Sequence, residues 1–184
     1  MEDKYKHKIL TVPNILSFFR ILLIPVIIWL YIGRDDPVGT TAVLALSGLT
    51  DVVDGIIARK CHMISDFGKA FDPIADKLTQ VAMLVCLVSR FQWMLLPLCV
   101  MVVKEFIAGI LGLLLIKRTG QVDGAVWHGK ATTASLYAMM LIHLLWYDIP
   151  GVFSGVLIGG CTVLALLSAF MYTRERILIL SQKA

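Results

Sequence analysis

This chain of 184 residues has few charged side chains. Aspartate, glutamate, lysine and arginine make up 16% of it and hydrophobic residues 58%, whereas about 25% of a typical soluble domain is charged. The mean hydropathy is +0.82. The charges are unevenly placed and leave several segments close to the roughly 20 apolar residues that a membrane-spanning helix needs. The composition therefore excludes an ordinary soluble domain and indicates one polytopic membrane domain over residues 1–184.

Other features are also missing from the sequence. The polar start, MEDKYKHKILTVPN, lacks a small-residue cleavage site before the first apolar run, so we expect no cleavable signal peptide. The four cysteines are scattered without a C-x-x-C pair, which favours buried thiols in helices over disulfides or a metal site. The net charge of +4 comes without aromatic-basic patterning, so no nucleic-acid partner is expected. No internal repeat is visible.

Six apolar segments of helical length predict an all-α fold with six transmembrane helices. They cover residues 15–32, 40–57, 74–88, 94–116, 131–146 and 152–171. The lysine-containing stretch before the first segment would lie on the membrane surface as a short interfacial helix, with a disordered tail as the alternative.

Lysine and arginine are unevenly divided between the two sides that six spans would create. An even number of spans puts both termini on one side, and this side would hold Lys4, Lys6, Lys8, Arg59, Lys60, Lys69, Lys117, Arg118, Lys130, Arg174, Arg176 and Lys183. The loops on the opposite side offer only Arg34 and Arg90. By the positive-inside rule the basic side is cytoplasmic. We therefore expect a multi-pass protein of the cell membrane (inner or plasma), with both termini in the cytoplasm.

Residues 51–77, DVVDGIIARKCHMISDFGKAFDPIADK, contain five aspartates. Asp51 and Asp54 are three positions apart at the end of the second apolar segment and would share a helix face. Asp72 and Asp76 are four positions apart at the start of the third segment and would also share one. If the two helices are antiparallel neighbours, the four carboxylates converge at one depth near the cytoplasmic side.

Four carboxylates in a low dielectric would be forced to take up protons unless a cation neutralises them. A hard divalent cation fits, because Mg²⁺ binds carboxylates together with the phosphates of a substrate. Simple pairing of these acids with lysines is the plainer alternative, but ionisable residues inside membrane spans are usually functional.

Small and basic residues in the same stretch suit a phosphate ligand. Gly55 and Ala58 keep one helix face free of bulk, and Gly68 would do the same on the following connection, although small residues also serve helix packing. Arg59 offers a fork of donors that matches a phosphate. Carboxylates, divalent cations and a phosphate are together typical of phosphoryl transfer, in which charge neutralisation and alignment matter most.

The spacing of these residues resembles the signature of the CDP-alcohol phosphatidyltransferase family. All eight specified positions are matched by Asp51-x2-Asp54-Gly55-x2-Ala58-Arg59-x8-Gly68-x3-Asp72-x3-Asp76. The segment PNILSFFR is similar to the first helix of the family, and six expected spans also agree with it. The resemblance implies transfer of a phosphatidyl group from CDP-diacylglycerol to an alcohol, with release of CMP.

The resemblance also implies which residues bind metal. Asp51, Asp54 and Asp72 would bind Mg²⁺ or Mn²⁺, with two ions in the site. Asp76 would share in ligation and would also be the base that takes the proton from the attacking hydroxyl.

By the same resemblance, the small and basic residues would hold the nucleotide. The cytidine and the diphosphate would be cradled by Gly55, Ala58, Arg59 and Gly68. Asn14, just before the first apolar segment, would reach the diphosphate. Homodimers are common in the family, so a homodimer is expected.

The acceptor alcohol is less well defined by the sequence. The short chain, its start VPNILSFFRILLIPVIIW and the segment FDPIADKLTQ look most like bacterial family members that use glycerol 3-phosphate. An anionic acceptor needs cations near the metal site, and the candidates are Lys104, Arg118 and Lys130, with Glu105 as a partner for one of them. Related synthases carry an Arg-Glu pair where this chain has Lys104-Glu105, and lysine lacks the bidentate fork of arginine.

Alternatives to glycerol 3-phosphate transfer remain. A cardiolipin synthase that uses phosphatidylglycerol is the nearest one, followed by relatives that use serine or inositol phosphate. A cation transporter, with the aspartates as a relay, is the alternative from a different class. It is disfavoured because transporters often show inverted repeats and broken helices, and neither is visible in the sequence.

Overall fold

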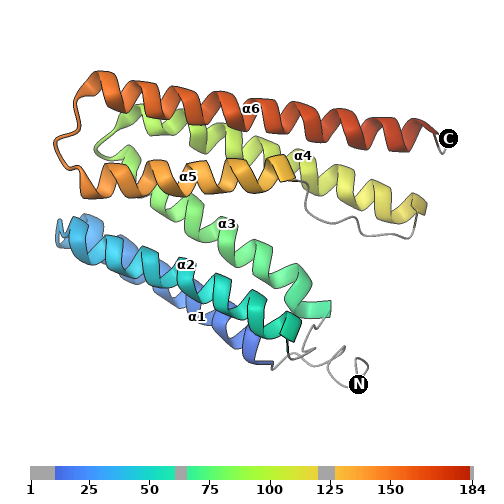
Figure 1. Cartoon of the computed structure of the whole chain (residues 1–184), viewed down its shortest axis with the longest axis horizontal. Helices are drawn as coiled ribbons and strands as arrows, with labels where there is room; N and C mark the ends of the chain where they lie inside the picture. Colours follow the sequence, from blue (N-terminus) through green and yellow to red (C-terminus); the bar gives the residue numbers. More distant parts are fainter. Residues whose placement is uncertain (1–10, 61–65, 120–126, 183–184) are drawn as a thin grey trace. The chain divides into compact units, whose positions relative to one another are not determined.

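The computed structural model describes residues 11–60, 66–119 and 127–182, and these ranges are helical apart from short connections (Figure 1). The elements in chain order are α1 (Val12–Ile28), the π-helical turn η2 (Trp29–Gly33), α2 (Pro37–Lys60), α3 (Asp66–Val88), the 3-10 turn η3 (Gln92–Met94), α4 (Leu95–Thr119), α5 (Trp127–Leu145) and α6 (Gly151–Gln182). The all-α prediction is therefore confirmed for the described residues. The expected N-terminal interfacial helix falls almost entirely on residues 1–10, which lie outside them.

Each of the six apolar segments corresponds to one α-helix, but only three stretches in the described ranges are long and apolar enough to cross a membrane by length and composition. They are Asn14–Gly33, Gln92–Leu115 and Gly151–Ser181. The apolar character of these stretches marks the chain as a membrane protein. Helices α2, α3 and α5 carry more polar, charged and small residues, which lowers their hydropathy.

Two helix boundaries differ clearly from the prediction, and the first of them concerns the site. Helix α3 begins at Asp66, well before residue 74, so Gly68 lies inside a helix and not on a connection. The apolar run that defined the predicted segment begins only at residue 74, and the helix continues before it through Pro73, which membrane helices tolerate where neighbours satisfy the freed backbone groups. Helix α6 continues to Gln182, beyond residue 171, because the polar residues that follow the apolar run are good helix formers.

Helices α1 and α2 begin with local caps. The Thr11 hydroxyl accepts a hydrogen bond from the backbone N–H of Asn14, at 3.5 Å, and caps α1. The Asp36 carboxylate accepts one from the backbone N–H of Gly39, at 2.8 Å, just before α2, whose first residue is Pro37. These caps fix where each helix starts.

The chain divides into two compact units, residues 1–86 and 87–184, with the division in the last turn of α3. In the first unit α1 packs against α2, and the buried side chains include apolar ones such as Leu23, Ile27 and Leu44. This unit also buries polar side chains: Thr11, Asn14, Ser17, Arg20, Thr40, Ser47, Thr79 and Gln80. Buried polar groups need partners, so this polar interior directs attention to the site described below.

In the second unit, α6 packs against both α4 and α5. A buried histidine links α5 to α6: His143 Nδ1 lies 2.8 Å from the Met139 carbonyl oxygen and Nε2 lies 3.0 Å from Ser154 Oγ. A carbonyl only accepts, so Nδ1 carries a proton and the neutral ring accepts from Ser154 through Nε2. His143 is thus satisfied by its helix and its neighbour, which is a structural role.

The cysteines agree in part with the expectation of buried thiols. Cys86 and Cys161 are buried, and Cys99 is exposed on α4. The expectation is wrong for Cys99 because α4 turns much of its apolar surface outward, as a lipid-facing helix does. All three are free thiols. Cys61 lies outside the described residues.

Candidate active site

The predicted acidic residues lie on two neighbouring helices along the chain. Asp51 and Asp54 belong to α2, and Asp72 and Asp76 belong to α3. Since both segments are regular helices, the spacings of three and four place each pair on one helix face, as predicted. The side chain of Asp54 lies outside the described part of the chain.

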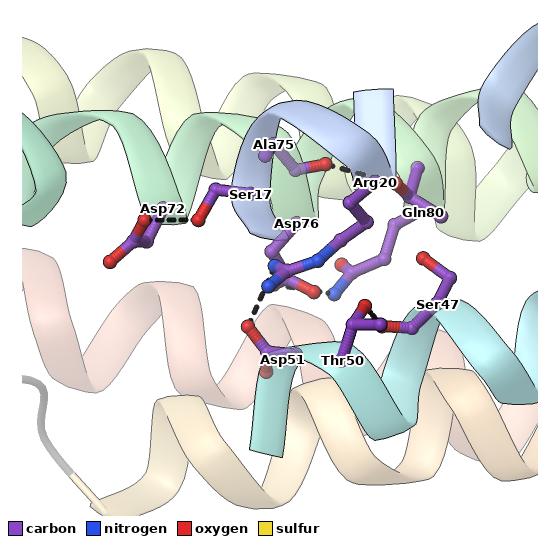
Figure 2. A network of polar contacts seen from close by, with 10 residues as sticks. Ser17, Arg20, Ser47, Thr50, Asp51, Asp72, Ala75, Asp76 and Gln80 are labelled. Carbon is purple, nitrogen blue, oxygen red and sulfur yellow. Dashed lines mark hydrogen bonds and ion pairs between the residues drawn. The ribbon is translucent and has the colours of Figure 1, made fainter. Parts of the chain in front are cut away.

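Each of the three described aspartates has a polar side-chain partner that is not in the motif (Figure 2). Asp51 Oδ1 lies 2.7 Å from Arg20 Nη1. Asp72 Oδ1 accepts a hydrogen bond from the Ser17 hydroxyl at 2.5 Å. On α3 itself, Asp76 Oδ2 accepts one from Gln80 Nε2 at 2.9 Å, one helical turn along. Each of these three carboxylates is thus held by a polar side chain.

Helix α1 connects the two acidic helices. Ser17 and Arg20 are three positions apart and share one face of α1. Through them this face contacts Asp72 of α3 and Asp51 of α2. The rings of Phe18 and Phe71 stack beside the first contact, with centroids 6.1 Å apart. One face of α1 therefore contacts one carboxylate of α2 and one carboxylate of α3, whereas the convergence of all four carboxylates stays a prediction.

Burial and charge distinguish the two sides of the Arg20–Asp51 pair. The Arg20 side chain is 1% exposed, whereas that of Asp51 is 48% exposed. A guanidinium buried without a counter-ion would be strongly destabilising, so the ionised Asp51 compensates it. Asp51 thus contacts the buried guanidinium of Arg20, and its own side chain remains accessible to solvent.

The donor chemistry of this cluster fits a hard divalent cation. Asp51, Asp72 and Asp76 all offer carboxylate oxygens, the ligands that Mg²⁺ and Mn²⁺ prefer. Among residues 11–60, 66–119 and 127–182, no group of three or more His, Cys, Asp or Glu side chains is close enough together to hold a metal as placed. The fit therefore rests on the type of donors and on their orientation by Ser17, Arg20 and Gln80.

The predicted nucleotide-binding residues are described less completely. Helix α2 contains Gly55, Ala58 and Arg59. What surrounds these three residues lies outside the described part of the chain. Gly68 is buried in α3. Asn14 is buried in the first turn of α1, on the helix that carries Ser17 and Arg20.

The candidate acceptor residues all belong to the second unit. Lys104 lies on α4 with its side chain 12% exposed, and its Nζ is 3.6 Å from Glu105 Oε1. Glu105 was expected to pair with one of the candidate cations, and it pairs with Lys104. Lys130 is exposed near the start of α5. Arg118 belongs to α4, and its side chain lies outside the described part.

Reasoning from the sequence missed Ser17, Arg20 and Gln80. A signal existed for Arg20, because an arginine within an apolar segment of spanning length is by default a functional candidate. Ser17 and Gln80 gave no comparable signal, since single polar residues in membrane helices often serve packing or bond to their own backbone.

Comparison with known proteins gives a consistent picture. The model of the CDP-alcohol phosphatidyltransferase family matches residues 10–173. A CDP-diacylglycerol–glycerol-3-phosphate 3-phosphatidyltransferase of Haemophilus influenzae is 36% identical over 141 residues, which cover 73% of this chain and 75% of the relative. One of the same name from Sodalis glossinidius is 31% identical over 172 residues, 89% of this chain and 93% of the relative. A cardiolipin synthase (CMP-forming) of Streptomyces coelicolor is 36% identical over 145 residues, 74% of this chain and 66% of the relative.

Proposed function

The chain belongs to the CDP-alcohol phosphatidyltransferase family, and on that basis we propose that it transfers the phosphatidyl group of CDP-diacylglycerol to glycerol 3-phosphate. The products are phosphatidylglycerophosphate and CMP, and the reaction belongs to phospholipid biosynthesis. The observation that carries this choice is the match to relatives named for this reaction, one of them along 93% of its length. The same match favours a transferase over a cation transporter.

In the proposed reaction, the acceptor hydroxyl oxygen forms a bond to the phosphorus that bears the diacylglycerol. The bond from this phosphorus to the oxygen bridging to CMP breaks, and CMP leaves with the electron pair. The hydroxyl proton passes to the carboxylate of Asp76, which Gln80 orients by its hydrogen bond at 2.9 Å.

The remaining aspartates would hold divalent cations. Asp51, Asp54 and Asp72 are the proposed ligands, shared by Asp76, with two Mg²⁺ or Mn²⁺ ions per site. Bound cations of this kind neutralise the diphosphate and stabilise the charge that grows on the leaving group. Arg59 would add a bidentate contact to the diphosphate.

The nucleotide would bind along the small residues of the motif. Gly55, Ala58 and Gly68 would let the cytidine and the diphosphate approach the helix backbones, and Asn14 would contact the diphosphate. A site at the membrane surface suits this substrate, because CDP is water-soluble while the diacylglycerol tails stay in lipid.

The membrane arrangement is part of the proposal. Six helices would span the bilayer of the cell membrane, with both termini and the carboxylates on the cytoplasmic side. The bias of lysine and arginine supports this orientation. We propose a homodimer only because homodimers are common in the family.

Cardiolipin synthesis, with phosphatidylglycerol as acceptor, is the second candidate function. It is favoured by the cardiolipin synthase relative and by Lys104, which stands where related synthases carry arginine. A lysine offers one point charge and not a planar fork, which weakens the case for tight binding of an acceptor phosphate.

A panel of acceptors separates the two candidates. Purified protein in mixed micelles of CDP-diacylglycerol with Mg²⁺ would be supplied separately with glycerol 3-phosphate, phosphatidylglycerol, serine or inositol phosphate, and CMP release would be measured. We expect release above the acceptor-free background with glycerol 3-phosphate alone. Release with phosphatidylglycerol alone would be consistent with the same catalytic residues and would establish cardiolipin synthesis as the function.

A further inference from the structure

The structure joins α1 to the acidic helices by two contacts that the motif does not contain. Ser17 donates a hydrogen bond to Asp72 of α3, and Arg20 pairs with Asp51 of α2 (Figure 2). We propose that Ser17 and Arg20 are positioning residues, which hold Asp72 and Asp51 in their cation-binding orientation and so set the cation affinity of the site. The inference rests on the proposed function only in requiring that these carboxylates bind divalent cations.

Burial shows that the two residues act through the carboxylates. Ser17 is fully buried and the Arg20 side chain is 1% exposed. Neither is open to solvent, from which a water-soluble nucleotide or cation arrives, whereas the Asp51 side chain is half exposed. A residue that contacts the ligand-binding group from behind, and is itself inaccessible, fixes the orientation of that group.

The division of oxygen atoms is consistent with this role. Arg20 contacts Oδ1 of Asp51, and Ser17 donates to Oδ1 of Asp72. A carboxylate has two oxygens and about four lone-pair sites, so each aspartate keeps acceptor capacity for a cation. Partners of this kind behind a metal ligand typically change metal affinity or activity by about 10–100-fold when they are removed.

Arg20 also brings a charge close to the site, which by itself opposes cation binding. The two effects predict opposite signs: loss of orientation weakens binding, whereas loss of the positive charge strengthens it. Ser17 is neutral, so its substitution reports orientation alone. We expect orientation to dominate at both positions, because without Arg20 the half-exposed Asp51 side chain would be freer to rotate.

Affinity for Mn²⁺ tests the proposal directly, without substrate. Free Mn²⁺ would be titrated by its electron paramagnetic resonance signal against the full chain, purified in detergent. We expect Ser17→Ala and Arg20→Gln to raise the Kd for Mn²⁺ by about 10–100-fold. Ser17→Thr keeps the hydroxyl and should restore most of the affinity. Ser47→Ala, a matched change at an equally buried serine of α2, should bind Mn²⁺ as the wild type does.

A second measurement separates positioning from a loss of structure. In CMP-release assays, raising the Mn²⁺ concentration should restore the kcat of Ser17→Ala while its half-saturating Mn²⁺ concentration stays raised. If Arg20→Gln does not fold, the Ser17 series with its threonine and Ser47 controls decides alone.

Three outcomes would overturn the proposal: unchanged Mn²⁺ affinity in folded Ser17→Ala, tighter binding in folded Arg20→Gln, or no Mn²⁺ binding by the wild type. Failure of the proposed function looks different. It would appear as normal Mn²⁺ binding, weakened in the variants as expected, with no CMP release from any acceptor.

Discussion

Replacing Asp76 with asparagine is expected to lower CMP release by roughly 10²–10⁴-fold, the usual contribution of a general base. Asparagine has nearly the same size but cannot take the proton from the acceptor hydroxyl. Its amide oxygen can still accept the hydrogen bond that Gln80 now donates to Asp76 at 2.9 Å. The helix and its packing should therefore persist, and the loss should appear in kcat and not in protein yield or thermal stability.

Asp148→Asn is the matched control for this variant. Asp148 lies outside the motif, in the second unit, and its side chain is 93% exposed, with Arg90 3.6 Å away. An exposed pair of this kind contributes little to stability, so the control should retain wild-type CMP release. If folded Asp76→Asn kept a tenth or more of the wild-type rate, Asp76 would not be the base.

Removal of divalent cations is expected to have the second large effect. Treatment with EDTA should reduce CMP release by at least about a hundredfold, because bound cations of this kind contribute several kcal/mol to such transition states. Without cations, the carboxylates of Asp51, Asp72 and Asp76 would repel the diphosphate of the substrate. Addition of Mg²⁺ or Mn²⁺ in excess of EDTA should restore the rate.

Two controls make the chelation result specific to the site. The melting temperature with and without EDTA would show whether the protein stays folded. Asp72→Ala should remain poorly active even in saturating Mg²⁺, since it removes a proposed ligand. Full activity of folded wild-type protein in EDTA would contradict the proposed use of metal.

Much of the fold was predictable because its signal is local. Each long apolar segment became one helix, since both apolar length and helix propensity are read along the chain. The boundary of α3 was predicted wrongly because polar residues can extend a helix beyond its apolar run. The apolar run begins only at residue 74, but the structure starts α3 at Asp66 and continues it through Gly68 and Pro73, residues that are tolerated when neighbouring helices compensate.

The aspartates of the site were also predictable, whereas the residues of α1 that contact them were not. The spacing of Asp51, Asp72 and Asp76 identifies helix faces without any knowledge of packing. The contacts of Ser17 and Arg20 depend on how α1 is rotated against α2 and α3, and sequence spacing within α1 does not define that rotation. Only the placement of the three helices shows that α1 contacts the aspartates of both α2 and α3.

The most direct test of the central claim follows the acceptor into the lipid product. Purified protein would be incubated with CDP-diacylglycerol, Mg²⁺ and glycerol 3-phosphate labelled in its glycerol carbons, and the chloroform-soluble label would be compared with the CMP released. We predict one labelled phosphatidylglycerophosphate for each CMP. CMP release without labelled lipid, or no release from folded protein with Mg²⁺ present, would contradict transfer to glycerol 3-phosphate.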